Sequence, residues 1–90
     1  MANIFVLNIE KEKSCLTLFE GEKVIASRAW AERRDMGEQL FVAIDEILRE
    51  RGLSAEMVTD FRIETEVSDA FTSVKIAQTV AKTFLFAIKA

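Results

Sequence analysis

Short apolar and alternating runs occupy the first third of the chain and predict β-strands. The run IFVL at positions 4–7 is apolar at every position, which is typical of a strand covered on both faces. Two further β-type runs, 14–19 and 23–30, flank Gly21, and this glycine can supply the positive φ of a tight hairpin. The pattern predicts three consecutive antiparallel strands, with the first at the centre of the sheet.

The hydrophobic period changes to that of a helix over residues 36–51. Asp35 followed by Glu38 predicts a capping box at the start of this helix. Gly52 followed by Leu53 predicts a Schellman ending. The apolar positions that share one side of the helix are Leu40, Ala43, Ile44, Ile47 and Leu48.

Residues 60–64 form a fourth β-type run, with Phe61 and Ile63 on one face. Ser68 is a suitable N-cap for a second helix, which we expect to run from about residue 70 to the carboxyl end. The apolar arc of this helix consists of Ala70, Val74, Ala77, Val80, Ala81, Phe84, Leu85 and Ile88. The positions that recur on the opposite, solvated side are Lys75, Lys82 and Lys89.

The element order βββαβα defines the expected fold. Because crossovers between parallel strands are right-handed, we expect the fourth strand to pair beside the first, in the strand order 3-2-1-4. The chain has 90 residues and no linker or internal repeat, so we expect residues 1–90 to form a single domain. The predicted class is α/β, with a mixed four-stranded sheet and two main helices.

The composition argues against several classes of enzyme. The chain contains no histidine and no proline, and its three glycines are isolated from one another. These absences remove histidine general-base chemistry, Cys/His metal sites and a glycine-rich loop that wraps a phosphate. The net charge is −3 and the two signs are interspersed, so we expect no direct binding of nucleic acid.

The expected compartment is the reducing cytoplasm. Cys15 is the single cysteine, so no internal disulfide can form, and the first residues lack the basic and apolar regions of a secretory signal. The apolar runs 4–7 and 84–88 are far shorter than the roughly 20 residues needed to cross a bilayer. We therefore expect no interaction with a membrane.

Few residues are candidates for chemistry. Cys15 lies in a predicted strand without a histidine to activate it, so we interpret it as a buried or half-buried structural thiol. Asn8 and Glu10 follow the first strand, where α/β sheets commonly place ligand groups. Glu64 and Glu66 lie at the end of the fourth strand. Solvated turns explain these residues better than a metal site, and we expect no catalytic residue, cofactor or metal.

Some apolar residues are predicted to lie outside the apolar sides of the helices. Phe86 lies among the lysines of the second helix, Val42 lies opposite the apolar side of the first, and Phe71 lies at the margin of the second. Two helices cover one face of a four-stranded sheet well, whereas the first strand is apolar on both faces. We therefore expect hydrophobic surface that a second chain buries.

Several segments carry a resemblance to a known family. They are IFVLN at 4–8, SCLTL at 14–18, LFVAIDEIL at 40–48 followed by GLS at 52–54, and AFTSVKIA at 70–77. The pattern resembles the amino-terminal half of the TsaB family, also called YeaZ, in the actin-like, ribonuclease-H-like ATPase superfamily. The resemblance covers nearly the whole chain and implies a single ribonuclease-H-like lobe.

The chain departs from the family pattern where the family binds nucleotide. Asn8 stands where the family has Asp, and VSD at 67–69 stands where the family has Gly-Pro-Gly. Ser73 and Ala77 replace two later glycines, and the second lobe has no counterpart. We therefore expect no nucleotide cleft between two lobes within these 90 residues.

TsaB-like proteins are regarded as non-catalytic partners of the larger TsaD subunit in the threonylcarbamoyladenosine modification of tRNA. Helices of their amino-terminal lobe form the contact. The resemblance thus implies a non-catalytic interaction subunit, in a homodimer or in a heterocomplex with a TsaD-like protein. The expected partner interface consists of Phe41, Val42, Phe71, Val74 and Phe86.

Two alternatives remain open. The chain could be a degenerate metal- or nucleotide-dependent hydrolase or phosphotransferase lobe that uses Asn8, Glu10 and Glu64. It could also be a stand-alone regulatory fragment that competes with a full-length homologue for its partner.

Overall fold

The computed structural model describes residues 2–31, 35–66 and 72–89, and the side chains of the last helix from Val74 to Leu85. Its elements are β1 (Asn3–Ile9), β2 (Lys13–Glu20), β3 (Lys23–Ala31), α1 (Met36–Arg51), the 3₁₀ turn η1 (Ala55–Met57), β4 (Val58–Thr65) and α2 (Thr72–Lys89). The order βββαβα is as predicted. The proposed N-cap Ser68 lies outside the described residues.

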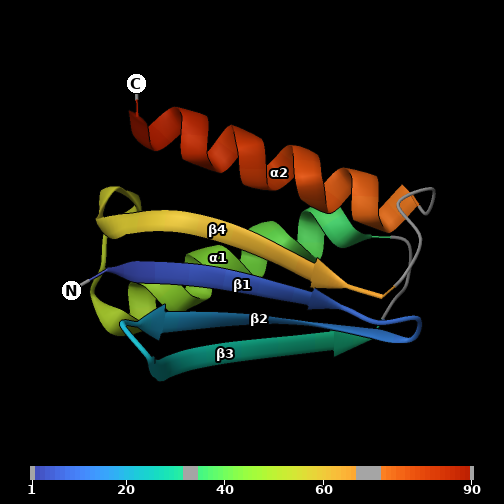
Figure 1. The fold of residues 1–90 in the computed structure, drawn as a ribbon, viewed down its shortest axis with the longest axis horizontal. Coiled ribbons are helices and arrows are strands. Elements are labelled where there is room, and N and C mark those ends of the chain that lie inside the picture. Colours follow the sequence, from blue (N-terminus) through green and yellow to red (C-terminus); the bar gives the residue numbers. More distant parts are fainter. Residues whose placement is uncertain (1, 32–34, 67–71, 90) are drawn as a thin grey trace.

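The sheet has the strand order β3-β2-β1-β4 (Figure 1). β1 pairs antiparallel with β2 and parallel with β4, and β2 pairs antiparallel with β3. The turn between β2 and β3 contains Gly21 at a φ of 63°, as the hairpin prediction requires. These pairings confirm the predicted mixed α/β sheet with β1 inside it.

Both helices lie on the same face of the sheet. Arg28 of β3 forms ion pairs with Glu46 and Glu50 of α1, and Figure 1 shows α1 behind the strands. α2 runs beside β4, and its Phe84 ring lies 6.1 Å from the ring centroid of Phe5 and 6.1 Å from that of Phe61. The face between the sheet and the helices is therefore the core.

The core is built from residues that alternate along the strands and recur along the helices. Phe5 and Phe61 lie on neighbouring parallel strands, with ring centroids 5.7 Å apart. Burying an aromatic or aliphatic side chain of this size contributes roughly 1.5–3 kcal/mol. The buried core residues are Phe5, Leu7, Ile9, Leu16, Leu18, Met36, Leu40, Ala43, Ile44, Ile47, Val58, Phe61, Val74, Ala77, Val80 and Ala81.

The opposite face of β1 retains the hydrophobic surface that the sequence predicts. Ile4 and Val6 are half-buried on that face, while Phe5 and Leu7 are fully buried on the helix side. No described helix covers Ile4 and Val6. Of the two apolar faces of β1, only the face toward the helices is therefore buried within the described residues.

The two ends of α1 test the capping predictions. At the carboxyl end, Gly52 has a φ of 65°, its N–H donates to the Arg49 carbonyl, and the Leu53 N–H donates to the Leu48 carbonyl. These hydrogen bonds confirm the Schellman ending.

The predicted capping box at the amino end of α1 is wrong. Asp35 makes no side-chain cap, because its φ of −123° and ψ of 33° lie outside the extended conformation of an N-cap. Its carboxylate instead accepts a hydrogen bond from the Gln39 side chain at 2.9 Å.

Replacement of Gly52 tests the Schellman ending. A Cβ at position 52 would meet no atom within 4 Å, so Gly52→Ala introduces no steric clash. Its only cost is the strain of holding alanine in the left-handed conformation. We expect Gly52→Ala to lower the free energy of unfolding by about 1 kcal/mol in urea denaturation. Gly52→Asn is the control and should cost less, because asparagine tolerates this conformation. An equal loss in both variants would contradict the assignment.

Candidate functional site

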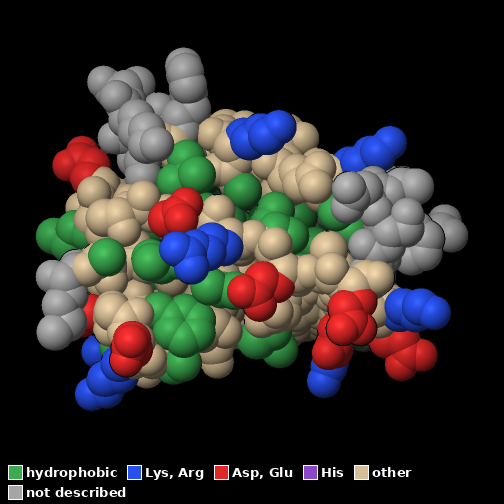
Figure 2. All heavy atoms as spheres, in the orientation of Figure 1, with side chains coloured by type: hydrophobic (Ala, Val, Ile, Leu, Met, Phe, Trp, Pro, Cys, Tyr) green, Lys and Arg blue, Asp and Glu red, His purple; other side chains and the backbone are tan. Residues whose placement is uncertain are grey.

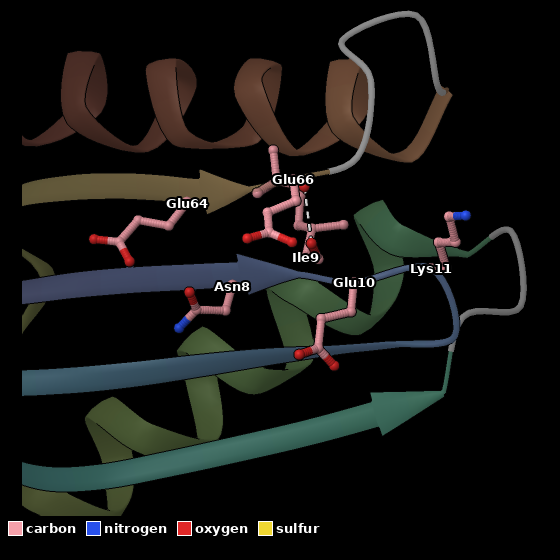
Figure 3. A pocket seen from close by; sticks show the side chains of 7 residues that line it. Asn8, Ile9, Glu10, Lys11, Glu64 and Glu66 are labelled. Carbon is pink, nitrogen blue, oxygen red and sulfur yellow. Dashed lines mark hydrogen bonds between the residues drawn. The ribbon is translucent and has the colours of Figure 1, made fainter.

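A cleft of about 720 Å³ lies at the carboxyl ends of β1 and β4 (Figure 3). Because these strands are parallel, their carboxyl ends meet at the same edge of the sheet, where α/β proteins commonly bind ligands. The lining residues are Asn8, Ile9, Glu10, Lys11, Glu64, Thr65 and Glu66. The structure thus brings together Asn8, Glu10, Glu64 and Glu66, the candidates from the two strand ends.

Backbone and side-chain hydrogen bonds set the geometry of the cleft. Thr65 Oγ1 donates to the Ile9 carbonyl at 2.8 Å and ties the two strand ends together. The Glu10 N–H donates to the Lys13 carbonyl at 2.9 Å and closes the turn into β2. Lys13 Nζ lies 3.7 Å from the Glu10 carboxylate, in a pair too exposed to add much stability. Asn8 and Glu64 are exposed register partners on neighbouring strands.

These residues do not fit a metal-bound nucleotide, the group that the resemblance seen in the sequence would imply. Asn8 presents a neutral amide, which is a weaker magnesium ligand than a carboxylate. Over 2–31, 35–66 and 72–89, no three His, Cys, Asp or Glu side chains are grouped so that they could hold a metal ion. The cleft therefore offers exposed carboxylates and a lysine without an assembled catalytic group.

Cys15 lies on β2, on the sheet face opposite the helices. It is half-buried, and its Sγ is 3.8 Å from Thr17 Oγ1. The chain contains no histidine that could act as a base for this thiol. Its half-buried position agrees with the structural role expected from the sequence.

A second candidate site is the outer side of α1, by which we mean its exposed surface at Phe41 and Val42. Phe41 is 57% exposed and Val42 is 48% exposed, although both are large hydrophobic residues in a well-formed helix. Phe41 follows Gly37 by one helical turn, and a Cβ on Gly37 would lie 3.3 Å from the Ile76 side chain of α2. Phe41 therefore lies at the edge of this outer side that borders α2, and Val42, the next residue, lies about 100° further round the helix.

The other residues of the predicted interface have different positions. Val74 is 0% exposed and belongs to the core, because it lies on the inward arc of α2. Val74 therefore has no surface to offer a partner in this structure. Phe71 and the side chain of Phe86 lie outside the described residues.

Two features of the surface have no counterpart in the predictions from sequence. Val24 of β3 is 54% exposed. A register shift between Leu18 and Phe19 makes Ile25 the extra residue of a bulge, so Val24 pairs with Phe19 on the sheet face opposite the helices. Ile76 is half-buried beside Gly37, and the isolated glycine in a helix was the signal for this close approach.

Among the described helices, none is long and apolar enough to cross a membrane.

The strand order, the parallel β1–β4 pair and the one-sided helices define a single α/β lobe with a mixed four-stranded sheet. Two solved structures have this fold. YeaZ from Pseudomonas aeruginosa matches with a TM-score of 0.82 and 22% identity, over 99% of this chain and 41% of that chain. A protein described as uncharacterized, with similarity to peptidase YeaZ from Pseudomonas aeruginosa, matches with a TM-score of 0.81 and 22% identity, over 99% of this chain and 40% of that chain.

The chain therefore has the fold of one lobe of YeaZ, or TsaB, and spans about two-fifths of the length of these neighbours. No family model matches the chain, and no curated protein matches it. The shared fold confirms the predicted resemblance and fold class.

The substitution Asn8→Asp tests whether the cleft lacks only a carboxylate to become a magnesium site. The new carboxylate would lie beside Glu64 on the neighbouring strand, so repulsion should lower the melting temperature. Millimolar Mg²⁺ should restore the melting temperature of the variant and leave the wild-type value unchanged. NaCl at equal ionic strength is the control. Equal stabilisation of both proteins by Mg²⁺ would contradict this view of the cleft.

Proposed function

We propose that this chain is a non-catalytic protein–protein interaction subunit that binds its partner through the outer side of α1. The observation that carries the proposal is the pair Phe41 and Val42, which are 57% and 48% exposed. Scattered exposed hydrophobes are common, but two large ones in succession on a helix suit a contact surface better than a solvated one.

Charges around this pair favour a partner with basic residues near an apolar patch. Glu38 and Asp45 lie one turn before and after Phe41, and Glu46 lies one turn after Val42. All three carboxylates are exposed, but Asp45 pairs with Arg49 of the same helix and Glu46 pairs with Arg28 of β3. Glu38 is therefore the carboxylate best placed to meet a basic side chain of a partner. Complementary charges at the rim of an interface mainly give specificity and speed of association, while the apolar centre gives affinity.

Two partners satisfy these requirements. One is a second copy of the chain, because α2 presents exposed Lys75 and Lys82 that a two-fold axis can bring to the acidic side of α1. The other is a TsaD-like protein, which the resemblance to TsaB suggests. In that heterocomplex the chain would serve the threonylcarbamoyladenosine modification of tRNA. It would act in the cytoplasm and would not contact the tRNA itself.

The substitution Phe41→Asp tests this interface. Self-association is measured by light scattering after size exclusion, and binding of a TsaD-like protein by calorimetry. We expect Phe41→Asp to weaken the observed association by about tenfold or more, because it places a charge at the apolar centre.

Val24→Asp is the matched control, because Val24 is 54% exposed but lies on β3, away from the outer side of α1. It should leave the association unchanged. A strictly monomeric chain that also fails to bind the TsaD-like protein would refute the proposal, and so would an equal loss in both variants.

A second candidate function is a degenerate hydrolase or phosphotransferase lobe. The cleft at the ends of β1 and β4 favours it, because Asn8, Glu10 and Glu64 line a space large enough for a small ligand. Calorimetry with ATP and Mg²⁺ separates the two functions. We expect no saturable heat, since the described residues form no metal-binding group. Saturable binding that Glu64→Gln abolishes would support the enzyme instead.

A further inference from the structure

β3 forms one edge of the sheet, and no described strand pairs with its outer side (Figure 1). On its inner side it pairs with β2 over Lys23–Ala31. An edge strand presents a row of backbone N–H and C=O groups that can pair with another chain. At 9 residues, β3 is longer than the average strand of about five to six residues. The outer side of β3 is therefore a candidate surface for strand addition.

The features that commonly protect an edge strand lie at the amino end of β3. Lys23 begins the strand, and the bulge at Ile25 interrupts its pairing with β2. The β3 edge segment, residues 26–31, keeps a regular register with β2 and contains no proline and no acidic residue. In Figure 2, no charged side chain shows along the middle of the lower edge, where Figure 1 places β3. The β3 edge segment is therefore open to pairing.

The side chains of the β3 edge segment alternate between the two faces of the sheet. Ala26 and Trp30 pack against the core on the helix side. Arg28 lies between them on that side, where Glu46 and Glu50 of α1 offset its charge. The exposed residues of the segment on the opposite face are Ser27, Ala29 and Ala31. An added strand therefore meets aromatic and basic groups on one face and small side chains on the other.

A second copy of β3 fits this edge in one antiparallel register. Directly opposite residues must share a face, so the two-fold axis passes through a residue position. An axis at Ser27 sets Val24 opposite Trp30, although the bulge leaves these two residues on different faces. An axis at Arg28 opposes two like charges. An axis at Ala29 avoids both conflicts, and an axis closer to either end of the segment pairs fewer residues.

The axis at Ala29 makes the contact self-complementary. Arg28 of each copy then lies opposite Trp30 of the other, so the symmetry forms two cation–π pairs on the helix side. The ion pairs with α1 already hold the Arg28 side chain, which lowers the entropy lost on association. On the other face, Ser27 lies opposite Ala31, and both side chains are small.

The helix layer accommodates the same arrangement. α1 contacts both β2 and β3, so it lies over these two strands. A sheet joined through β3 therefore places the α1 helices of the two copies two inter-strand spacings apart, or roughly 10 Å. Packed helices commonly lie about 8–10 Å apart. A second copy thus continues both the sheet and the helix layer, whereas a single extended peptide continues the sheet alone.

We propose that two copies of this chain associate through their β3 edges, in an antiparallel β3–β3 pair centred on Ala29 that joins the two four-stranded sheets into one. This contact goes beyond the proposed function, because it uses neither Phe41 nor Val42. The two contacts lie on different surfaces of the molecule and can be tested separately.

Disulfide trapping tests the register. Cys15 is the only cysteine, so a Cys15→Ser background lets one new thiol be placed in each chain. Ala29→Cys sets two thiols directly opposite each other, with Cα atoms about 4.5–5.5 Å apart, which suits a disulfide. Ser27→Cys is the matched control on the same face, because its symmetry mate lies four residues away, or roughly 13 Å. We expect Ala29→Cys to form a disulfide-linked dimer faster than the control by about tenfold or more under mild oxidation.

A charge substitution tests the pair without a crosslink. Ala29→Lys places two ammonium groups opposite each other at the axis, so we expect the dimer dissociation constant from analytical ultracentrifugation to rise about fivefold. Val24→Lys is the control and should leave this constant unchanged, because Val24 is 54% exposed on the same strand but precedes the bulge. Circular dichroism confirms that each variant is folded.

Phe41→Asp separates this contact from the interface on α1. Added to the Ala29→Cys chain, it should leave the rate of disulfide formation unchanged. A failure of the β3 contact is then distinguishable from a failure of the proposed function.

Three results would each overturn the proposal. The first is an equal rate of disulfide formation in Ala29→Cys and Ser27→Cys. The second is a dimer that Ala29→Lys leaves intact. The third is a chain that stays monomeric at millimolar concentration, including the case in which an added acidic peptide protects the amides of β3 from hydrogen exchange, which would identify a foreign strand as the occupant.

Discussion

The parallel pairing of β1 with β4 positions every other part of this lobe. A parallel pair requires a crossover, and here β2, β3 and α1 intervene in the chain before β4 returns beside β1. The pairing sets Phe61 against Phe5, and Phe84 of α2 packs on both rings. The same pairing brings the carboxyl ends of β1 and β4 together, so both the core and the cleft depend on the pairing of these two strands.

One-sided coverage of the sheet follows from that arrangement and shapes the proposed functions. α1 and α2 bury the helix side of β1 and leave Ile4 and Val6 half-buried on the sheet face opposite the helices. Exposed apolar surface thus includes Phe41 and Val42 on α1 and, on the opposite face of the sheet, Val24 of β3. A domain of this size gains stability by burying such surface against another polypeptide.

The chemistry at the strand ends is limited by residue type rather than by geometry. The cleft occupies the usual ligand position of an α/β sheet, yet Asn8 supplies an amide where a carboxylate would be needed for a metal. Glu10 is held in the turn to β2 and pairs with Lys13. Under the proposed function, this fold serves as a scaffold for contacts with another polypeptide.

The sequence alone determined the elements, the strand order and the Schellman ending at Gly52, because hydrophobic period, glycine conformation and crossover handedness are local or general constraints. It also placed Asn8 and Glu64 near each other, since parallel strands end at the same edge. Only the tertiary structure decided that Val74 is buried and that Val24 is exposed beside a bulge. Exposure depends on residues that are distant in the chain and meet only on folding, and no local pattern records which face they will cover.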